Sequence, residues 1–301
     1  LAFVQAACPE AWEKLQRHYG DQAESRLLEN LRKRVDRYGT LEVLRYGFKD
    51  RGARVELCQF PPDHAMNPGA LARYRANRLR VVPEVSYSLH AREGDYNPRL
   101  DLVLFVNGLP VATLELKSEF QQPVGEAIRQ YRHDRPPTAP TTRKSEPLLQ
   151  PKRGALVHFA VSQQEVWMTT QLAGADTAFL PFNKGTADGG AGNPPNPEGH
   201  ATAYLWEEAL APENWLRILG RFVHVQQEDK QDARGRWYRK ETLIFPRYHQ
   251  WDAVRRLITT TQQEGPGHRY LIQHSAGSGK SNTIAWTAHQ LAQLYTDDGA
   301  K

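Results

Sequence analysis

Three charged side chains interrupt an otherwise apolar stretch, and their types and spacing could support metal-dependent chemistry. Asp101, Glu115 and Lys117 lie in Asp-Leu-Val-Leu-Phe-Val-Asn-Gly-Leu-Pro-Val-Ala-Thr-Leu-Glu-Leu-Lys, residues 101–117. A charge among buried strands is costly unless it is paired or binds a metal. Carboxylate oxygens suit Mg²⁺, which polarises phosphoryl oxygens and lowers the pKa of bound water. The pattern predicts Asp101 and Glu115 as Mg²⁺ ligands, with Lys117 orienting the water or stabilising negative charge.

The element that must position these residues is a β-hairpin that turns at the Asn-Gly pair 107–108. This dipeptide is a strong hairpin signal, and the apolar runs beside it predict central strands covered on both faces. A two-residue loop there puts Asp101 opposite Leu114, with Glu115 on the other face. A loop one residue longer, with a bulge, puts Asp101 across from Glu115 instead. Lys117 then shares the face of both carboxylates.

The same residues also fit a structural explanation, a cross-strand ion pair of Lys117 with Asp101 or Glu115 at the rim of a sheet. The order of an aspartate, a hairpin and then Glu-x-Lys nevertheless resembles the PD-(D/E)xK nucleases. Leu100 stands where the literal motif has proline, although Pro98 is near. The resemblance implies a mixed α/β sheet flanked by helices, with Asp101, Glu115 and Lys117 as catalytic residues.

A helix predicted over residues 124–134 follows the hairpin, and this order fits the nuclease core. PD-(D/E)xK enzymes of the helicase-linked type often carry Gln-x-x-x-Tyr on this helix. Here the fourth residue after Gln130 is Asp134, so Gln130 matches the pattern and Tyr131 is out of register. The resemblance implies a role for Gln130 in the nuclease site. The alternative is a glutamine on the helix surface without such a role.

A second motif lies near the far end, where a strand predicted over 270–274, Tyr-Leu-Ile-Gln-His, leads into a glycine-rich loop and a predicted helix over 282–295. Strand, glycine loop and helix in this order are the context of a P-loop, which binds the phosphates of ATP at a helix N-terminus. Lys280 would reach the β- and γ-phosphates, and Ser281 would bind Mg²⁺. The predicted nucleotide-binding residues of the loop are Gly277, Ser278, Gly279, Lys280 and Ser281.

Two further features resemble the superfamily 2 motors. His274 occupies the first position of the loop, where these motors tolerate residues other than glycine. Upstream, the segment 245–254 resembles their Q-motif, in which a glutamine reads the adenine edge and an aromatic residue stacks on the base. The resemblance puts Gln250 on the adenine, with Tyr248 or Phe245 as the stacking residue.

A nuclease hairpin followed by a Q-motif and a P-loop resembles the R subunit (restriction and motor, HsdR-type) of type I restriction–modification enzymes. Further segments that look like this family are 45–49, 77–81, 102–111, 157–160, 179–183 and 204–206. The resemblance implies Mg²⁺-dependent cleavage of double-stranded DNA coupled to ATP-driven translocation. It also implies methyltransferase (M) and specificity (S) subunits as partners.

The same resemblance divides the chain into a nuclease domain over 1–225, a linker over 226–243 and the beginning of a RecA-like domain over 244–301. The chain stops one helix after the P-loop, without a Walker B acidic pair, so we expect an N-terminal fragment that lacks ATPase activity. The nucleases of this class often add an acidic residue from the first helix, for which Glu24 and Glu29 are candidates.

Two other functional classes fit parts of the sequence. One is a superfamily 2 helicase or translocase whose nuclease-like domain only binds DNA. The other is a P-loop phosphotransferase or signalling NTPase with an unrelated β-rich domain, which leaves the grouping of Asp101, Glu115 and Lys117 unexplained and predicts no affinity for DNA.

Composition sets broader limits. The 301 residues include 39 Lys and Arg against 34 Asp and Glu, a net charge of +5 that permits nucleic-acid binding without requiring it. The two cysteines, Cys8 and Cys58, have no metal or redox spacing and indicate reduced thiols in a cytoplasmic protein. No apolar run approaches the ~20 residues that span a membrane, so no membrane association is expected.

The remaining chain predicts elements around the two motifs. Helical spacing of apolar residues predicts helix over 9–38, and the run 40–47 predicts a short strand. Residues 155–162 and 165–170 predict a strand pair that extends the sheet of the hairpin. The glycine- and proline-rich stretch 183–200 predicts a long loop without P-loop spacing.

Overall fold

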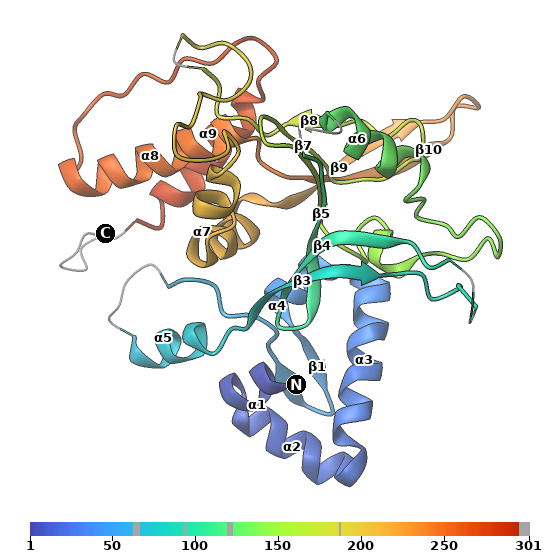
Figure 1. The fold of residues 1–301 in the computed structure, drawn as a ribbon. Helices are drawn as coiled ribbons and strands as arrows, with labels where there is room; N and C mark the ends of the chain where they lie inside the picture. The colour runs from blue at the N-terminus through green and yellow to red at the C-terminus, as the bar shows by residue number, and fades with distance from the viewer. Residues whose placement is uncertain (63–66, 93, 95, 119–122, 187, 295–301) are drawn as a thin grey trace.

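A six-stranded mixed sheet forms the centre of the molecule in this computed structural model, which describes residues 1–62, 67–92, 94, 96–118, 123–186 and 188–294 (Figure 1). The sheet has the order β3-β4-β5-β6-β7-β8. Only β5 and β6 run parallel; the other neighbours are antiparallel. The strands are β3 (Leu79–Ser86), β4 (Arg99–Val106), β5 (Leu109–Leu116), β6 (Val157–Val161), β7 (Val166–Thr169) and β8 (Leu180–Pro181). The predicted α/β class with a mixed sheet is confirmed.

The N-terminal helices and a small hairpin lie together at one end of the molecule, drawn in blue (Figure 1). They comprise α1 (Ala2–Ala7), α2 (Pro9–Tyr19), α3 (Ala23–Tyr38), α4 (Thr40–Tyr46), β1 (Phe48–Asp50) and β2 (Ala53–Val55). The helix predicted over 9–38 is confirmed, with a break at Gly20, whose φ of +54° is easily adopted only by glycine. Leu15 and Leu27 anchor the two halves in the core.

The strand predicted over 40–47 is wrong, because this run forms helix α4. Thr40, Leu41, Val43 and Leu44 are all buried, a spacing that one face of a helix produces. Short apolar runs do not distinguish a buried helix from a buried strand. The Thr40 hydroxyl donates to the carbonyls of residues 153 and 154, which ties the start of the helix to the loop before β6.

Helix α6 (Val124–His133) connects the parallel strands β5 and β6 and packs on one face of the sheet. Ala127 and Tyr131 of this helix lie in a buried cluster with Val103 of β4 and Ala160 of β6. The prediction of a helix over 124–134 is confirmed. The predicted strand pair is confirmed as well, since β6 and β7 form neighbours in the same sheet.

The opposite face of the sheet is covered by segments from later in the chain (Figure 1). These are two π-helical turns, Leu205–Ala209 and Ile218–Phe222, with α7 (Pro212–Arg217) between them, then α8 (Tyr248–Glu264) and α9 (Lys280–Leu291). Helix α5 (Pro68–Arg75) precedes β3, and its N-terminus is capped by the Asn67 side chain. No helix in the described ranges is long and apolar enough to cross a membrane.

The stretch 226–243, predicted as a linker, lies within an antiparallel hairpin of β9 (His224–Gln231) and β10 (Trp237–Ile244). Its outer part is exposed and charged, and Arg239 pairs with Asp229 across the strands at 3.3 Å. The base of the hairpin is tied to the sheet, because the Thr170 hydroxyl donates to the Leu243 carbonyl over 2.8 Å.

Aromatic rings join the sheet to the chain that follows this hairpin. Phe182 lies against Phe159 of β6, Phe245 and Tyr248, with ring centroids 5.6 to 6.1 Å apart. Trp251 of α8 and Trp286 of α9 belong to the same buried cluster. The residues after 244 therefore share one hydrophobic core with the central sheet, and tilted or edge-on ring contacts stabilise that junction.

Replacing Phe182 by alanine should lower the free energy of unfolding by about 3 to 5 kcal/mol, because it leaves a cavity among the rings that it contacts. Phe182 is fully buried, whereas Ile284 on α9 is 68% exposed. Ile284→Ala is therefore the matched control, with an expected change within about 0.5 kcal/mol. Urea unfolding of both variants measures the difference, and equal effects would contradict the proposed core.

Candidate functional site

The β4–β5 hairpin brings the predicted nuclease residues together through a turn and a bulge. Val106 pairs with Leu109, so the loop has two residues, Asn107 at φ +52° and Gly108 at φ +91°. Positive φ at both positions is the type I′ turn that favours Asn-Gly. The register then shifts between Leu104 and Phe105, so that Leu102 pairs with Leu114.

Continuing this register by one residue places Asp101 across from Glu115. The structure thus combines the shorter of the two predicted loops with the shifted pairing of the longer one. The extra residue is Val111, beside Pro110, which has no N–H to donate to the ladder. A proline inside a hairpin disrupts the backbone hydrogen bonds least when it lies at a bulge.

Glu115 is completely buried and forms an ion pair with Arg135, which is 6% exposed. Arg135 Nε donates to Glu115 Oε1 over 2.7 Å. The other carboxylate oxygen, Oε2, is buried and has no hydrogen-bond partner within the described ranges. Burial raises the pKa of Glu115 to about 7; Arg135 lowers the pKa, Asp101 raises it and Lys117 lowers it. Glu115 thus lies within the electrostatic reach of both other predicted site residues.

Asp101 and Lys117 are half-buried at the end of the hairpin. Asp101 Oδ2 accepts the backbone N–H of Leu116 over 2.7 Å, which holds its carboxylate against the neighbouring strand. The backbone N–H of Lys117 donates to the Val161 carbonyl over 2.8 Å and continues the pairing of β5 with β6. Both residues are therefore positioned by backbone pairing of central strands.

Helix α6 faces the side of the sheet that carries the carboxylates. Tyr131, which the sequence placed out of register, is fully buried, and its hydroxyl hydrogen-bonds the Thr113 hydroxyl at 2.8 Å. Thr113 also bonds His158 Nδ1 at 2.7 Å, so His158 is a packed core residue, as its apolar strand predicts. Gln130 lines a cavity of about 620 Å³, and Arg135 forms part of the wall of the same cavity.

The carboxylates fit the ligand preference of Mg²⁺. Within the residues that the structure describes, no group of three or more His, Cys, Asp or Glu side chains is arranged to hold a metal. Mg²⁺ is usually bound through only one or two carboxylates, together with waters and substrate phosphates. The unpartnered buried oxygen of Glu115, next to Asp101, is the feature that such an ion would satisfy.

The glycine loop lies at the start of α9, which begins at Lys280. Gly277 and Gly279 have φ of +71° and +81°, values that glycine adopts without strain. Lys280 Nζ donates to the carbonyls of His274 and Ser275 over 3.3 and 2.9 Å. The Ser278 hydroxyl is buried without a partner in the described chain, which leaves a donor available to an anion.

The predicted strand at 270–274 is not formed; residues 270–273 are exposed, Leu271 to 92%, and His274 is partly buried. A strand needs a neighbour to pair its backbone groups, and none lies beside this run within the described residues. The helix predicted over 282–295 begins two residues earlier and ends at Leu291; Tyr295 lies outside the described residues.

The Q-motif segment holds the glycine loop from one side. The Arg247 guanidinium donates to the Gly277 carbonyl over 3.0 Å, and Gln250 Nε2 donates to the Gly279 carbonyl over 2.9 Å. Gln250 Oε1 accepts the N–H of Arg247, so both ends of this amide are occupied. Phe245 and Tyr248, the predicted stacking residues, are 5% exposed and belong to the aromatic core. Both rings pack against protein in this structure, and stacking of either one on a base stays a prediction.

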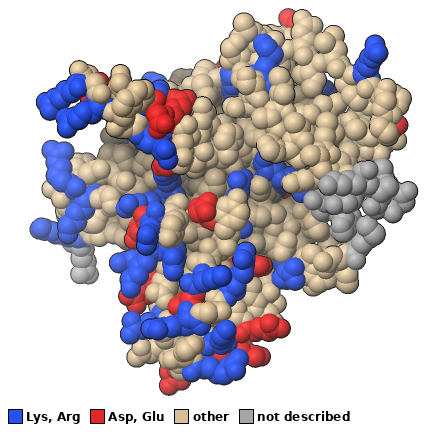
Figure 2. Space-filling view, turned by 180° about the vertical axis from the view of Figure 1, so that it is seen from behind, with Lys and Arg blue, Asp and Glu red and all other residues tan. Residues whose placement is uncertain are grey.

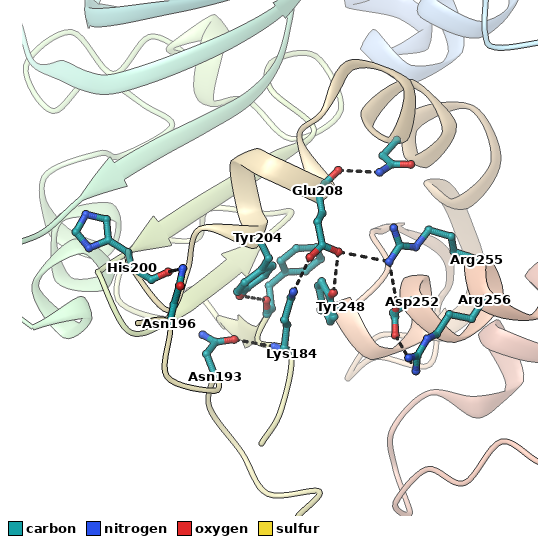
Figure 3. Close-up of polar contacts among 12 residues, drawn as sticks. Lys184, Asn193, Asn196, His200, Tyr204, Glu208, Tyr248, Asp252, Arg255 and Arg256 are labelled. Atoms are coloured by element: carbon teal, nitrogen blue, oxygen red, sulfur yellow. Dashed lines mark hydrogen bonds and ion pairs between the residues drawn. The ribbon is translucent and has the colours of Figure 1, made fainter. Parts of the chain in front are cut away.

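A polar network joins the loop after β8 to α8 (Figure 3). The Glu208 carboxylate accepts from Lys184 Nζ at 2.5 Å, from the Tyr248 hydroxyl at 3.3 Å and from Arg255 at 3.4 Å. Arg255 also pairs with Asp252 at 3.0 Å. These ion pairs lower the pKa of Glu208, although partial burial opposes them. The network fixes one end of the 183–200 loop against the Q-motif helix.

A comparison with family models finds a match over residues 4–177, to the model described as type I restriction enzyme R protein N terminus. The match covers more than half of the chain. The chain belongs to this family. No curated protein matches the chain. The matched range contains the hairpin, α6 and Arg135, while the P-loop lies beyond it.

For this member of the R-protein family, the sequence did not identify Arg135. One signal in the sequence could have found it. A glutamate inside a buried strand requires a cationic partner, and Arg135 directly follows the helix after that strand. Of the two candidates for an acidic residue from the first helix, Glu29 pairs with Arg26 and Lys33 on the exposed side of α3, and this explains its lowered pKa. We therefore assign Glu29 no place in the site.

The metal-free chain should lose stability as pH rises from about 4.5 to about 7, because of Glu115. In this window the unfolded chain releases the Glu115 proton while the folded chain keeps it, so ionisation favours unfolding. The effect is on the order of 3 kcal/mol at most. Urea unfolding of wild type and Glu115→Gln across this window gives the contribution as their difference. A difference that stays constant with pH would contradict the raised pKa.

Proposed function

We propose that this chain supplies the nuclease site of a type I restriction enzyme R subunit, which hydrolyses phosphodiester bonds of double-stranded DNA with Mg²⁺. The observation that carries the proposal is the convergence of Asp101, Glu115 and Lys117 at one end of the β4–β5 hairpin. The unpartnered oxygen of buried Glu115 supports it, because buried polar atoms usually have a partner and a bound metal would supply one.

In this proposal the two carboxylates hold the metal, with Asp101 steadied by Leu116 N–H and Glu115 by Arg135. When bound, Mg²⁺ supplies Lewis-acid activation of the phosphoryl group and of a water. Lys117 is half-buried beside Glu115 and carries its positive charge next to the carboxylates. Its ammonium group orients the attacking water or stabilises the negative charge that develops on the phosphate.

Double-stranded DNA is the proposed substrate. Lysine and arginine side chains gather over the N-terminal helices and along one side of the face in Figure 2, while much of the rest of that face is uncharged. Contacts of basic side chains to phosphates position a protein on DNA without reading its sequence. Such contacts suit a subunit whose recognition site is read elsewhere, and we propose the M and S subunits of the type I complex as partners.

The segment from 244 onward is proposed as the beginning of an ATP-driven translocase. Gly277 and Gly279 stand directly before α9, and a glycine-rich loop at a helix N-terminus supports phosphate binding. Gln250 lies against this loop, as a Q-motif glutamine should, although its amide is engaged by Arg247 and Gly279. In this proposal Mg²⁺ and ATP bind at Lys280 and Ser281, and adenine contact requires Gln250 to exchange its partners. We expect the 301-residue chain by itself to show no ATPase turnover.

Lys117→Ala should lower plasmid cleavage by at least about 100-fold, because one positive charge at the developing oxyanion is lost. The measurement is cleavage of supercoiled plasmid by the R subunit assembled with its M and S partners, in the presence of Mg²⁺ and ATP. ATP hydrolysis should be unchanged. Lys230→Ala is the control, since the Lys230 side chain on β9 is 43% exposed and pairs with Glu228.

If Lys117→Ala cuts as well as wild type, the cluster is a structural ion pair and the nuclease assignment fails. A complex that binds and translocates DNA yet never cuts, with wild-type residues, would favour a helicase or translocase with a DNA-binding nuclease-like domain.

A further inference from the structure

Arg135 is the one cation that touches the buried carboxylate of the hairpin in the described chain, and it comes from a different element. It follows α6 directly, and its side chain is 7% exposed. Nε donates to Glu115 Oε1 over 2.7 Å, while Nη1 donates to the carbonyl of the preceding Asp134 over 3.2 Å. The guanidinium is thus bonded both to the end of the helix and to the carboxylate.

The consequence for Glu115 is geometric. One carboxylate oxygen is held by Arg135, and the other is buried without a hydrogen-bond partner among the described residues. A flexible carboxylate in water would rotate between many orientations, and selecting one for a metal would cost conformational entropy. With Oε1 held by Arg135, the orientation of the carboxylate, and therefore of Oε2, is already restricted before a metal arrives.

Asp101 has a matching arrangement, because its Oδ2 accepts the Leu116 N–H. Each of the two carboxylates therefore has one oxygen fixed by the protein. The fixing groups differ in kind: a backbone N–H of β5 for Asp101, and a side chain from beyond α6 for Glu115. Only the second can be removed by substituting a residue outside the hairpin.

We infer that Arg135 is a positioning residue, which orients the Glu115 carboxylate for a divalent metal and does not itself touch metal or substrate. The inference rests on the proposed nuclease function. Arginine suits this role because its planar fork can bond the carboxylate and the helix-end carbonyl together, which a lysine ammonium does less well. Groups that orient a metal ligand from outside typically change metal affinity by about 10- to 100-fold when they are removed.

The cavity beside Arg135 makes a direct test available. Arg135, Tyr87 and Gln130 line this space of about 620 Å³, which is large enough to admit a free guanidinium ion. Arg135→Ala should weaken Mn²⁺ binding by about 10- to 100-fold, and added guanidinium chloride below denaturing concentrations should restore part of it. Guanidinium should not restore binding to Asp101→Ala, which lacks a ligand.

The experiment is a titration of the purified chain with Mn²⁺, followed by electron paramagnetic resonance and by calorimetry, with thermal unfolding recorded for every variant without metal. Arg129→Ala is the matched control, since Arg129 lies on α6, the helix that Arg135 follows, and pairs with Glu126 at 2.7 Å on the exposed side of that helix. We expect wild-type metal affinity for this control.

The outcomes separate the inference from the function on which it rests. If Asp101→Ala binds Mn²⁺ as tightly as wild type, the proposed nuclease metal site itself fails. If Asp101→Ala loses the metal while folded Arg135→Ala binds it like wild type, only the role of Arg135 fails. Should Arg135→Ala not fold, Arg135→Lys decides: reduced affinity in the folded protein supports positioning, and unchanged affinity overturns it.

Discussion

The burial of one carboxylate inside a central strand is the constraint on which the site depends. Glu115 has no exposed surface, so water cannot solvate its charge, and the protein must supply a cation. Arg135 supplies it through a single short bond to one oxygen. A buried pair of this kind is weak evidence for stability, because desolvation of both charges offsets their attraction. In the proposed function the pair has another role, which is to leave the second oxygen of Glu115 unpartnered for a metal.

Connectivity brings that cation to the strand. Strands β5 and β6 are parallel neighbours, and parallel neighbours require a crossover that leaves one end of the sheet and returns to the other. Helix α6 forms the crossover and packs on the face that carries Thr113 and Glu115. Arg135 follows α6 directly, and its side chain contacts Glu115.

The later part of the chain depends on the same sheet in a different manner. Its aromatic residues, including Phe245 and Trp251, extend the core that Phe159 and Phe182 begin on the opposite face. In the chain before α9, the run 270–274 has no neighbouring strand among the described residues, and its apolar side chains remain exposed. The part of the chain after residue 244 is therefore held by the packing of its helices. The run 270–274 forms no strand.

Local patterns alone determined the elements whose signals lie within a few residues: the Asn-Gly turn, the helix after Pro123, the strand pair around 163–164 and the glycine loop before Lys280. They also limited the hairpin to two registers. Local patterns failed at 40–47, where a short apolar run fits helix and strand equally. Only the tertiary structure decided the pairing of Asp101 with Glu115, through a bulge, and the contact with Arg135. Both depend on which groups meet across the sheet, and residues distant in sequence meet only after the chain has packed.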